Sequence, residues 1–296
     1  FNKFLSIYNE LIDDYPYSTS FISDLADIYF QQSNYRKSKS YVYECLKLAP
    51  ELGVYWSDLG HCHEEMGDDA AAIEAYGKSL VYNPRDYDTR ESMRKLQGKN
   101  PIWDSFEEPD LYEIYEDAPP ADSFPEDNSL ILADDHHRVI YPEGGSEMKH
   151  YFLVKVFNAT GVDSWKEYSI STGGNMSVNI EKAEVLKKDG SRLKAETSGT
   201  YVVFTNLEEG DCILLIYKGQ YYNYGAMTKH FDDKHYFTSL VPQKHTSYSL
   251  LVPNEYEFTH KMTNSEMEPQ VTSNGDYTMY KWEMVNLPSL KEETYM

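Results

Sequence analysis

The sequence of 296 residues lacks several features that would define a function class. It has only three cysteines, Cys45, Cys62 and Cys212, and their spacing fits neither a metal site nor an even-numbered disulfide framework. No uncharged apolar run approaches the roughly 18 to 20 residues that a membrane-spanning helix needs. Basic residues are scarce, since 27 Lys and Arg stand against 49 Asp and Glu, and the net charge of −22 repels phosphate backbones. These absences argue against a transmembrane segment and against a nucleic-acid partner.

Catalytic groups are equally scarce. A cysteine nucleophile needs an exposed position at a helix start, with a His and an Asp brought to it. Cys45 and Cys62 instead fall inside expected helices, and Cys212 opens an expected strand. Each is more simply a small buried hydrophobic residue. We therefore expect no catalytic residue in this chain.

The nine histidines form no clear set of metal ligands. His136 and His137 are adjacent, so they would point to opposite faces of a strand. The densest group of His and Asp lies at 230–235. A zinc or calcium site there stays open beside the simpler interpretation of a solvated polar strand. We expect no metal and no cofactor.

The N-terminal third repeats at a constant interval, because Pro16, Pro50 and Pro84 are equally spaced. The better copy carries large, small and turn residues at fixed positions, namely Trp56, Leu59, Gly60, Gly67, Ala72, Tyr76 and Pro84. The interval and the pattern resemble the tetratricopeptide repeat, in which two antiparallel helices form each unit of about 34 residues.

The repeat register gives domain boundaries. A partial repeat is expected at 1–18, complete repeats at 19–52 and 53–86, and a capping helix at 87–97. Together they form a first domain at 1–99. Because a helix pair cannot bury its apolar face alone, we expect the chain to be a fragment with further repeats before it.

First-helix positions of the two complete repeats would line the concave face of such a superhelix. They are Ser23, Asp27, Phe30, Gln31, Ser57, His61, Glu64 and Glu65. The subgroup of these repeats that grips a C-terminal carboxylate has Lys, Arg and Asn at these places, and this sequence has none there. We therefore expect a protein or peptide partner with a basic or neutral segment. The alternative is a spacer whose groove is solvated.

An acidic segment follows the repeats. Residues 100–135 hold twelve Asp and Glu and no Lys or Arg, and five prolines interrupt them. We take 100–129 as an acidic linker. Side chains such as Trp103 and Leu111 are too apolar for a solvated tether, so we expect it to pack on a neighbouring domain, with a short helix at 108–115. The alternative is a cation site or a docking surface for a basic partner.

After residue 129 the sequence becomes strand-rich. Short β-branched and aromatic runs alternate with turn residues about every ten positions, and glycines at 143–145 and 188–190 supply turns. We expect an all-β sandwich at 130–296. The fold class is then α + β, multidomain, with an N-terminal tetratricopeptide α-superhelix followed by the sandwich.

Four motifs in this domain carry a second resemblance. They are DHHRVIY at 135–141, GGSEMKHYFLVKV at 144–156, EVLKKDGSRL at 184–193 and NLEEGDCILLIY at 206–217. Together they resemble the bacterial domain of unknown function that precedes transglutaminase-like cores, over about 123–296. The resemblance implies an accessory domain, a Cys/His/Asp core beyond Met296, and a place in the bacterial periplasm or cell envelope.

Aromatic residues are the remaining lead, because the chain has 27 tyrosines. A possible ligand platform consists of Tyr221, Tyr222, Tyr224 and Tyr236. Such rings could bind a sugar or a peptide, although strand alternation would turn half of them to the core. We interpret the chain as a non-catalytic protein-interaction and accessory module of a larger protein. The alternative is a glycan- or peptide-binding subunit of an envelope enzyme.

Overall fold

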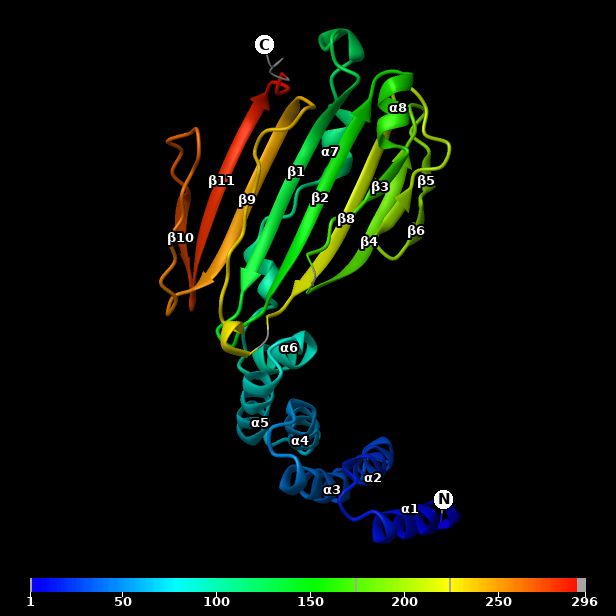
Figure 1. The fold of residues 1–296 in the computed structure, drawn as a ribbon, viewed down its shortest axis with the longest axis vertical. Coiled ribbons are helices and arrows are strands. Elements are labelled where there is room, and N and C mark those ends of the chain that lie inside the picture. The colour runs from blue at the N-terminus through cyan, green and yellow to red at the C-terminus, as the bar shows by residue number, and fades with distance from the viewer. Residues whose placement is uncertain (1, 174, 224, 292–296) are drawn as a thin grey trace. The chain divides into compact units, whose positions relative to one another are not determined.

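The structure, a computed structural model, describes the backbone of residues 2–173, 175–223 and 225–291, with side chains from residue 5 onward. Its internal contacts divide the chain into two units, Phe1–Ser105 and Phe106–Met296. Figure 1 shows helices in the first unit and mostly strands in the second. Among the described residues, no helix combines the length and apolar character that crossing a bilayer requires.

The helical unit consists of antiparallel helices in which each packs against the next along the chain (Figure 1). This confirms the expected series of helix pairs. The elements are α1 (Asn2–Asp14), α2 (Thr19–Gln31), α3 (Tyr35–Leu48), α4 (Gly53–Glu65), α5 (Asp69–Tyr82), α6 (Tyr87–Leu96) and the 3-10 helix η1 (Ile102–Ser105).

The repeat period extends to the turns between paired helices. Ser33 after α2 and Gly67 after α4 both have positive φ, at 58° and 75°. A left-handed residue there ends the helix, and glycine adopts it at least cost. The next residues, Asn34 and Asp68, each accept a hydrogen bond from the backbone N–H three positions on, at 3.3 Å. The same chemistry therefore starts α3 and α5.

Close packing between α4 and α5 depends on Gly60. A Cβ atom at Gly60 would lie 2.4 Å from ring atoms of Tyr76, so only glycine allows the ring to fill this space. Tyr76 and Ala72 are fully buried, and Leu59 lies against the same helix pair with 3% of its surface exposed. This packing holds the two helices of the repeat together.

The second unit is built on an eight-stranded sheet with the order β10-β11-β9-β1-β2-β8-β4-β5 and a three-stranded sheet with the order β3-β7-β6. All neighbours in the large sheet are antiparallel except β1 and β9, which are parallel, so the sheet is mixed. The strands are β1 (Ser129–Ile140), β2 (Ser146–Val156), β3 (Glu167–Ser169), β4 (Met176–Leu186), β5 (Arg192–Lys194), β6 (Glu196–Ser198), β7 (Tyr201–Val203), β8 (Cys212–Tyr221), β9 (Gln243–Pro253), β10 (Gln270–Asn274) and β11 (Tyr277–Leu287).

The expected all-β layer is confirmed, but its two sheets are unequal. The small sheet packs on one face of the large sheet, where Phe152 and Val154 of β2 share a buried cluster with Val202 of β7. The short helix α8 (Ala159–Trp165) adds Trp165 to this cluster. Farther along the large sheet, β9 and β11 carry a separate apolar cluster around Tyr248, Leu250 and Trp282, which the loops after β8 and β9 cover.

The acidic segment covers the opposite face of the large sheet. Its helix α7 (Leu111–Glu116) buries Leu111 against Leu130, Leu153 and Leu214. The expected packing of this segment on a domain is therefore found, and the helix lies close to the expected range. Most of the segment belongs to the β unit, because the boundary between the units falls after Ser105.

Polar contacts also hold the acidic segment on the sheet. The Tyr112 hydroxyl donates to Glu184 Oε2 at 2.8 Å, and the Arg192 guanidinium lies 3.7 Å from the centre of the Tyr112 ring. Lys149 Nζ lies 2.7 Å from Glu108 Oε1. Lys149 thus neutralises part of the charge that the segment carries.

Candidate functional site

The repeat register predicts that α2 and α4 line the concave surface of the repeats, and all eight expected side chains belong to these two helices. The eight expected side chains differ in exposure. Asp27, Gln31 and Glu65 are exposed, whereas Ser23, Phe30, His61 and Glu64 are partly buried and Ser57 is buried.

Ser57 offers no surface to a ligand. Its hydroxyl lies 2.6 Å from the hydroxyl of Thr89 on α6, and only 5% of the residue is exposed. The sequence argument placed Ser57 in the groove because it shares the repeat position of Ser23. The capping helix α6 covers that position in the last repeat, so Ser57 acts in packing there.

Two of the expected side chains are held in place by Tyr76. The His61 ring lies edge-on to the Tyr76 ring, with 5.3 Å between their centres, and 6.5 Å from the centre of the Phe30 ring. The Tyr76 hydroxyl donates to Glu64 Oε2 at 2.6 Å. Burial, followed by this hydrogen bond, raises the pKa of Tyr76. His61 and Glu64 therefore present one fixed arrangement.

Two further carboxylates of this face were missed by the sequence argument. Asp24 and Asp58 occupy equivalent places in the two complete repeats, one repeat interval apart. Asp24 Oδ2 accepts a hydrogen bond from the Tyr8 hydroxyl at 3.0 Å. Because an acidic residue recurs at the same position of both complete repeats, the sequence alone could have identified Asp24 and Asp58.

Asp58 has two acidic neighbours, Asp27 and Asp86. Burial, followed by the nearby charges of Asp27 and Asp86, raises its pKa to about 7. Burial, followed by the charge of Asp24, also raises the pKa of Asp27. Carboxylates that disfavour each other's ionisation gain stability when a cation comes close. The concave surface can therefore bind a positively charged group.

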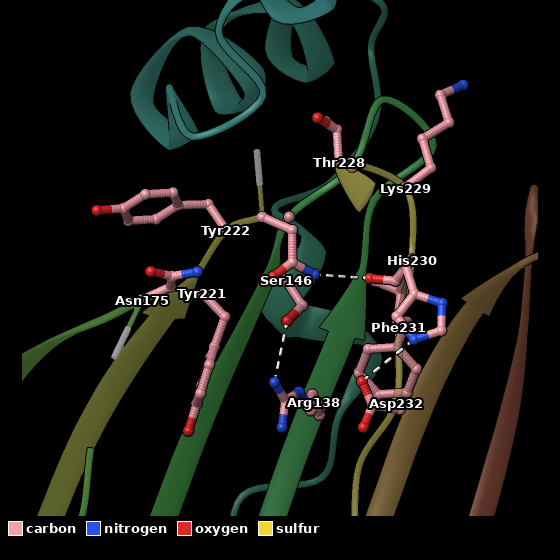
Figure 2. Close-up of a pocket in the computed structure, with 14 residues that line it drawn as sticks. Arg138, Ser146, Asn175, Tyr221, Tyr222, Thr228, Lys229, His230, Phe231 and Asp232 are labelled. Atoms are coloured by element: carbon pink, nitrogen blue, oxygen red, sulfur yellow. Dashed lines mark hydrogen bonds and ion pairs between the residues drawn. The ribbon is translucent and has the colours of Figure 1, made fainter. Parts of the chain in front are cut away.

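The β unit carries a pocket of about 120 Å³ at one end of β1, β2 and β8 (Figure 2). Arg138 lies in its wall, with its guanidinium 4.1 Å from the centre of the Tyr221 ring and 5.1 Å from that of Phe231. Figure 2 shows these two rings on opposite sides of Arg138. Arg138 Nη1 donates to Asp233 Oδ2 at 2.6 Å, and Nη2 donates to Ser146 Oγ at 3.2 Å.

The four tyrosines of the expected platform do not lie together. Tyr221 and Tyr222 line the pocket, together with Lys229, which extends outward in Figure 2. Tyr236 does not line it and has 76% of its surface exposed. Tyr224 lies outside the described residues. The pocket offers a half-buried ring and groups of both charges, which suits a small polar ligand.

The His and Asp set at 230–235 lies in a loop, so the interpretation as a strand was wrong. Its members also separate. His230 lies 3.4 Å from Asp232 at the surface, while Asp233 is paired with Arg138. His235 turns inward, and its ring centre lies 4.7 Å from that of His136 on β1.

None of the three cysteines has the features of an activated nucleophile. All three are buried and free. Burial is the largest cause that raises the pKa of each thiol, to about 12 for Cys45 and Cys212. They are therefore protonated near neutral pH, and a thiol is a far weaker nucleophile than a thiolate.

Comparison with known families agrees with this architecture. Residues 22–52 and 54–86 match the tetratricopeptide repeat model. Residues 196–291 match the model described as a domain of unknown function with a solved structure (DUF3857). The helical unit therefore resembles tetratricopeptide repeats and the β unit resembles this domain of unknown function, in agreement with the two resemblances expected from the sequence, the second over residues 196–291. The repeats indicate a protein-interaction module.

Individual relatives resemble only parts of the chain. The general transcriptional corepressor trfA of Dictyostelium discoideum is 28% identical over 87 residues, which are 29% of this chain and 6% of that protein. A crystal structure of a candidate protease from Parabacteroides distasonis shares 17% identity, with a TM-score of 0.49 over 56% of this chain and 37% of that one. The first tetratricopeptide domain of Spaghetti (RPAP3), solved with the HSP90 peptide SRMEEVD, shares 19% identity, with a TM-score of 0.30 over 31% of this chain and 72% of that one.

Proposed function

We propose that the chain is a non-catalytic interaction module whose repeats bind a basic or neutral peptide segment on the concave surface of α2 and α4. The observation that carries this proposal is the group of carboxylates on that surface. Asp58 has a pKa raised to about 7 by burial and by Asp27 and Asp86, so a bound Lys or Arg would relieve repulsion that already exists. A spacer has no need for this concentration of charge.

The proposed binding can be tested by selecting peptides from a random library displayed against the full chain. Sequences rich in Lys or Arg are expected to be enriched. Their affinity should fall as NaCl rises from about 50 to about 500 mM, because salt screens exposed charges. Enrichment of acidic peptides, or of none at all, would contradict the proposal.

A matched pair of double variants locates the binding surface. The change Asp27→Asn with Asp58→Asn removes two carboxyl groups from the concave surface and, measured at pH 8, where both are largely ionised, should weaken a selected basic peptide about tenfold, as two screened ion pairs would. The control is Glu51→Gln with Asp69→Asn, two exposed acids outside α2 and α4. Equal loss of affinity in the two proteins would mean that only net charge matters.

The β unit is proposed to be an accessory domain of a larger bacterial transglutaminase-like protein, with its Cys/His/Asp core supplied in cis. The resemblance of residues 135–217 to the domain that precedes such cores supports this proposal. Sequencing the gene on the far side of the codon for Met296 tests it. A Cys, a His and an Asp at the spacing of that core are expected, and a stop codon would contradict it.

The pocket beside Arg138 supports a second candidate, a glycan- or peptide-binding subunit of an envelope enzyme. The half-buried Tyr221 ring and the Arg138 guanidinium stacked on it form one wall. Thermal-shift screening with a glycan panel tests this candidate. A glycan that raises Tm for the native chain but not for Tyr221→Ala would support it, and no stabilising glycan would argue against it.

A further inference from the structure

Three potential metal ligands converge between β1 and β2, on the side where the loop after β8 covers the sheet. Asp134 and His136 are two residues apart on β1, so they share one face. The antiparallel register places His150 of β2 directly opposite His136. Strand pairing thus brings together side chains that are well separated in the sequence.

The ligand atoms of these side chains point to one place. Asp134 Oδ1 lies 2.7 Å from His150 Nε2 and 3.1 Å from His136 Nε2. The two imidazole rings are stacked, with 3.8 Å between their centres. All three donor atoms lie within 4.8 Å of one another. A central ion about 2.0 to 2.2 Å from each donor fits a triangle of this size after small rotations of the side chains.

The surroundings favour a cation at this place. Exposed side-chain fractions are 5% for His150, 17% for Asp134 and 19% for His136. The described ion-pair partners of Asp134 are these two histidines, and neither a Lys nor an Arg is among them. One carboxylate oxygen and two imidazole nitrogens already meet at this place, and a divalent ion bound between them would neutralise the carboxylate. The partial exposure of His136 leaves a route for the ion to enter.

We propose that Asp134, His136 and His150 bind one divalent transition-metal ion, with Zn²⁺ as the expected occupant. One carboxylate oxygen and two imidazole nitrogens form a donor set that suits Zn²⁺ and the neighbouring first-row ions. The remaining position would take water. His235 is the next imidazole, with its ring centre 4.7 Å from that of His136 and its Nε2 3.5 Å from Thr246 Oγ1. The ion would tie β1 to β2 independently of peptide binding by the repeats.

The test uses the full chain and a readout that needs no activity. After dialysis against a slight excess of ZnCl₂ and then against metal-free buffer, elemental analysis is expected to find one Zn²⁺ per chain. Co²⁺ in place of Zn²⁺ should give visible absorption bands of a low-coordinate site containing nitrogen ligands. Tm should rise with ZnCl₂ concentration, because an ion that binds the folded state stabilises it.

Variants assign the ligands. His136→Gln and His150→Gln should each reduce Zn²⁺ affinity at least about 100-fold, on the order of losing one ligand. His230→Gln, which removes a half-exposed histidine from the surface loop, is the control and should retain the metal. Circular dichroism of each variant shows whether the fold is kept, and His136→Gln, at the more exposed position, is the safer change.

Two results would overturn the proposal. One is the absence of stoichiometric binding of Zn²⁺, Co²⁺ or Ni²⁺ to the native chain. The other is retention of the bound ion and its Co²⁺ spectrum in folded His136→Gln. In either case the three side chains are only a hydrogen-bonded cluster in which two imidazoles share one carboxylate oxygen.

Discussion

The helical unit and the β unit place their ionisable groups in opposite ways. In the helical unit, Asp58 is a partly buried carboxylate with acidic neighbours, and burial, followed by the charges of Asp27 and Asp86, raises its pKa to about 7. In the β unit, charged groups that are distant in the sequence are paired, such as the buried Arg138 of β1 with Asp233 of the loop after β8. A surface whose acidic groups are stabilised by an added cation is suited to binding a ligand. Ion pairs within a domain are instead suited to holding its segments in place.

The two units also differ in how their contacts relate to the sequence. Each helix packs on the next helix along the chain, so stability is built from neighbouring pairs. In the β unit, β1 pairs with both β2 and the distant β9. Damage to one helix pair should therefore stay local, while damage at the centre of the sheet should affect the whole β unit.

The largest expected effect comes from Tyr76→Ala. This change empties the fully buried space beside Gly60 and should cost about 3 to 5 kcal/mol of stability in the repeats. Hydrogen exchange measured by mass spectrometry should show lost protection in α4 and α5 with protection unchanged in β1 and β2. The control Tyr82→Ala removes a half-exposed ring. Equal loss of protection in both units would contradict the local character of the repeats.

Arg138→Ala tests the paired interior of the β unit. It leaves Asp233 without its cation and removes the group between the Tyr221 and Phe231 rings, so we expect a loss of about 2 to 3 kcal/mol in urea unfolding. Adding Asp233→Ala should restore part of the loss, since the orphaned carboxylate is then gone. Simple additivity of the two changes would show that the pair is not coupled.

The variant Asp58→Asn tests how the ionisation of Asp58 changes the stability of the helical unit with pH. The pKa of Asp58 is raised from 3.8 to about 7 by burial and nearby acids, so its ionisation opposes folding. The penalty grows as pH rises from about 4 to about 7 and is constant above that. Relative to the native chain, the variant should gain about 2 to 3 kcal/mol of stability between pH 5 and pH 8, at about 1.4 kcal/mol per pH unit up to about pH 7. Thermal unfolding of both proteins across this range measures the gain, and parallel pH curves would contradict it.

The smallest effect is expected at His245 on β9. Its Nδ1 lies 2.8 Å from Asp135 Oδ1, and this hydrogen bond is the largest cause that raises the pKa of His245 above 6.5. The raised value adds stability that is fully present below pH 6.5 and is lost as pH rises through the pKa of the folded state. His245→Gln should therefore destabilise the β unit by under about 1 kcal/mol at pH 5.5 and less at pH 9. Unfolding at the two pH values, with His230→Gln as control, measures this, and a larger loss at pH 9 would contradict the sign.

The sequence predicted the helical unit well because its information is periodic. The constant repeat interval located the helices of both complete repeats and the turn at Gly67. It did not predict that Ser57 is buried, because that depends on Thr89 of the capping helix, which does not repeat the pattern.

The β unit was predicted less completely because strand register is a long-range property. The sequence indicated strands at His136 and at His150 and a turn between them, and a hairpin centred on Glu143 would have paired the two histidines. No comparable sequence pattern indicated that His235 turns inward or that Arg138 pairs with Asp233. They depend on how the loop after β8 folds over the sheet, and nothing in its composition fixes that path.

Whether α2 and α4 form the binding surface can be measured by hydrogen exchange of the full chain, with and without a saturating basic peptide from the selection. We expect slower exchange in α2 and α4 when the peptide is bound, and no change in the strands of the β unit. Slower exchange confined to the β unit, with both helices unaffected, would show that the repeats do not bind the peptide.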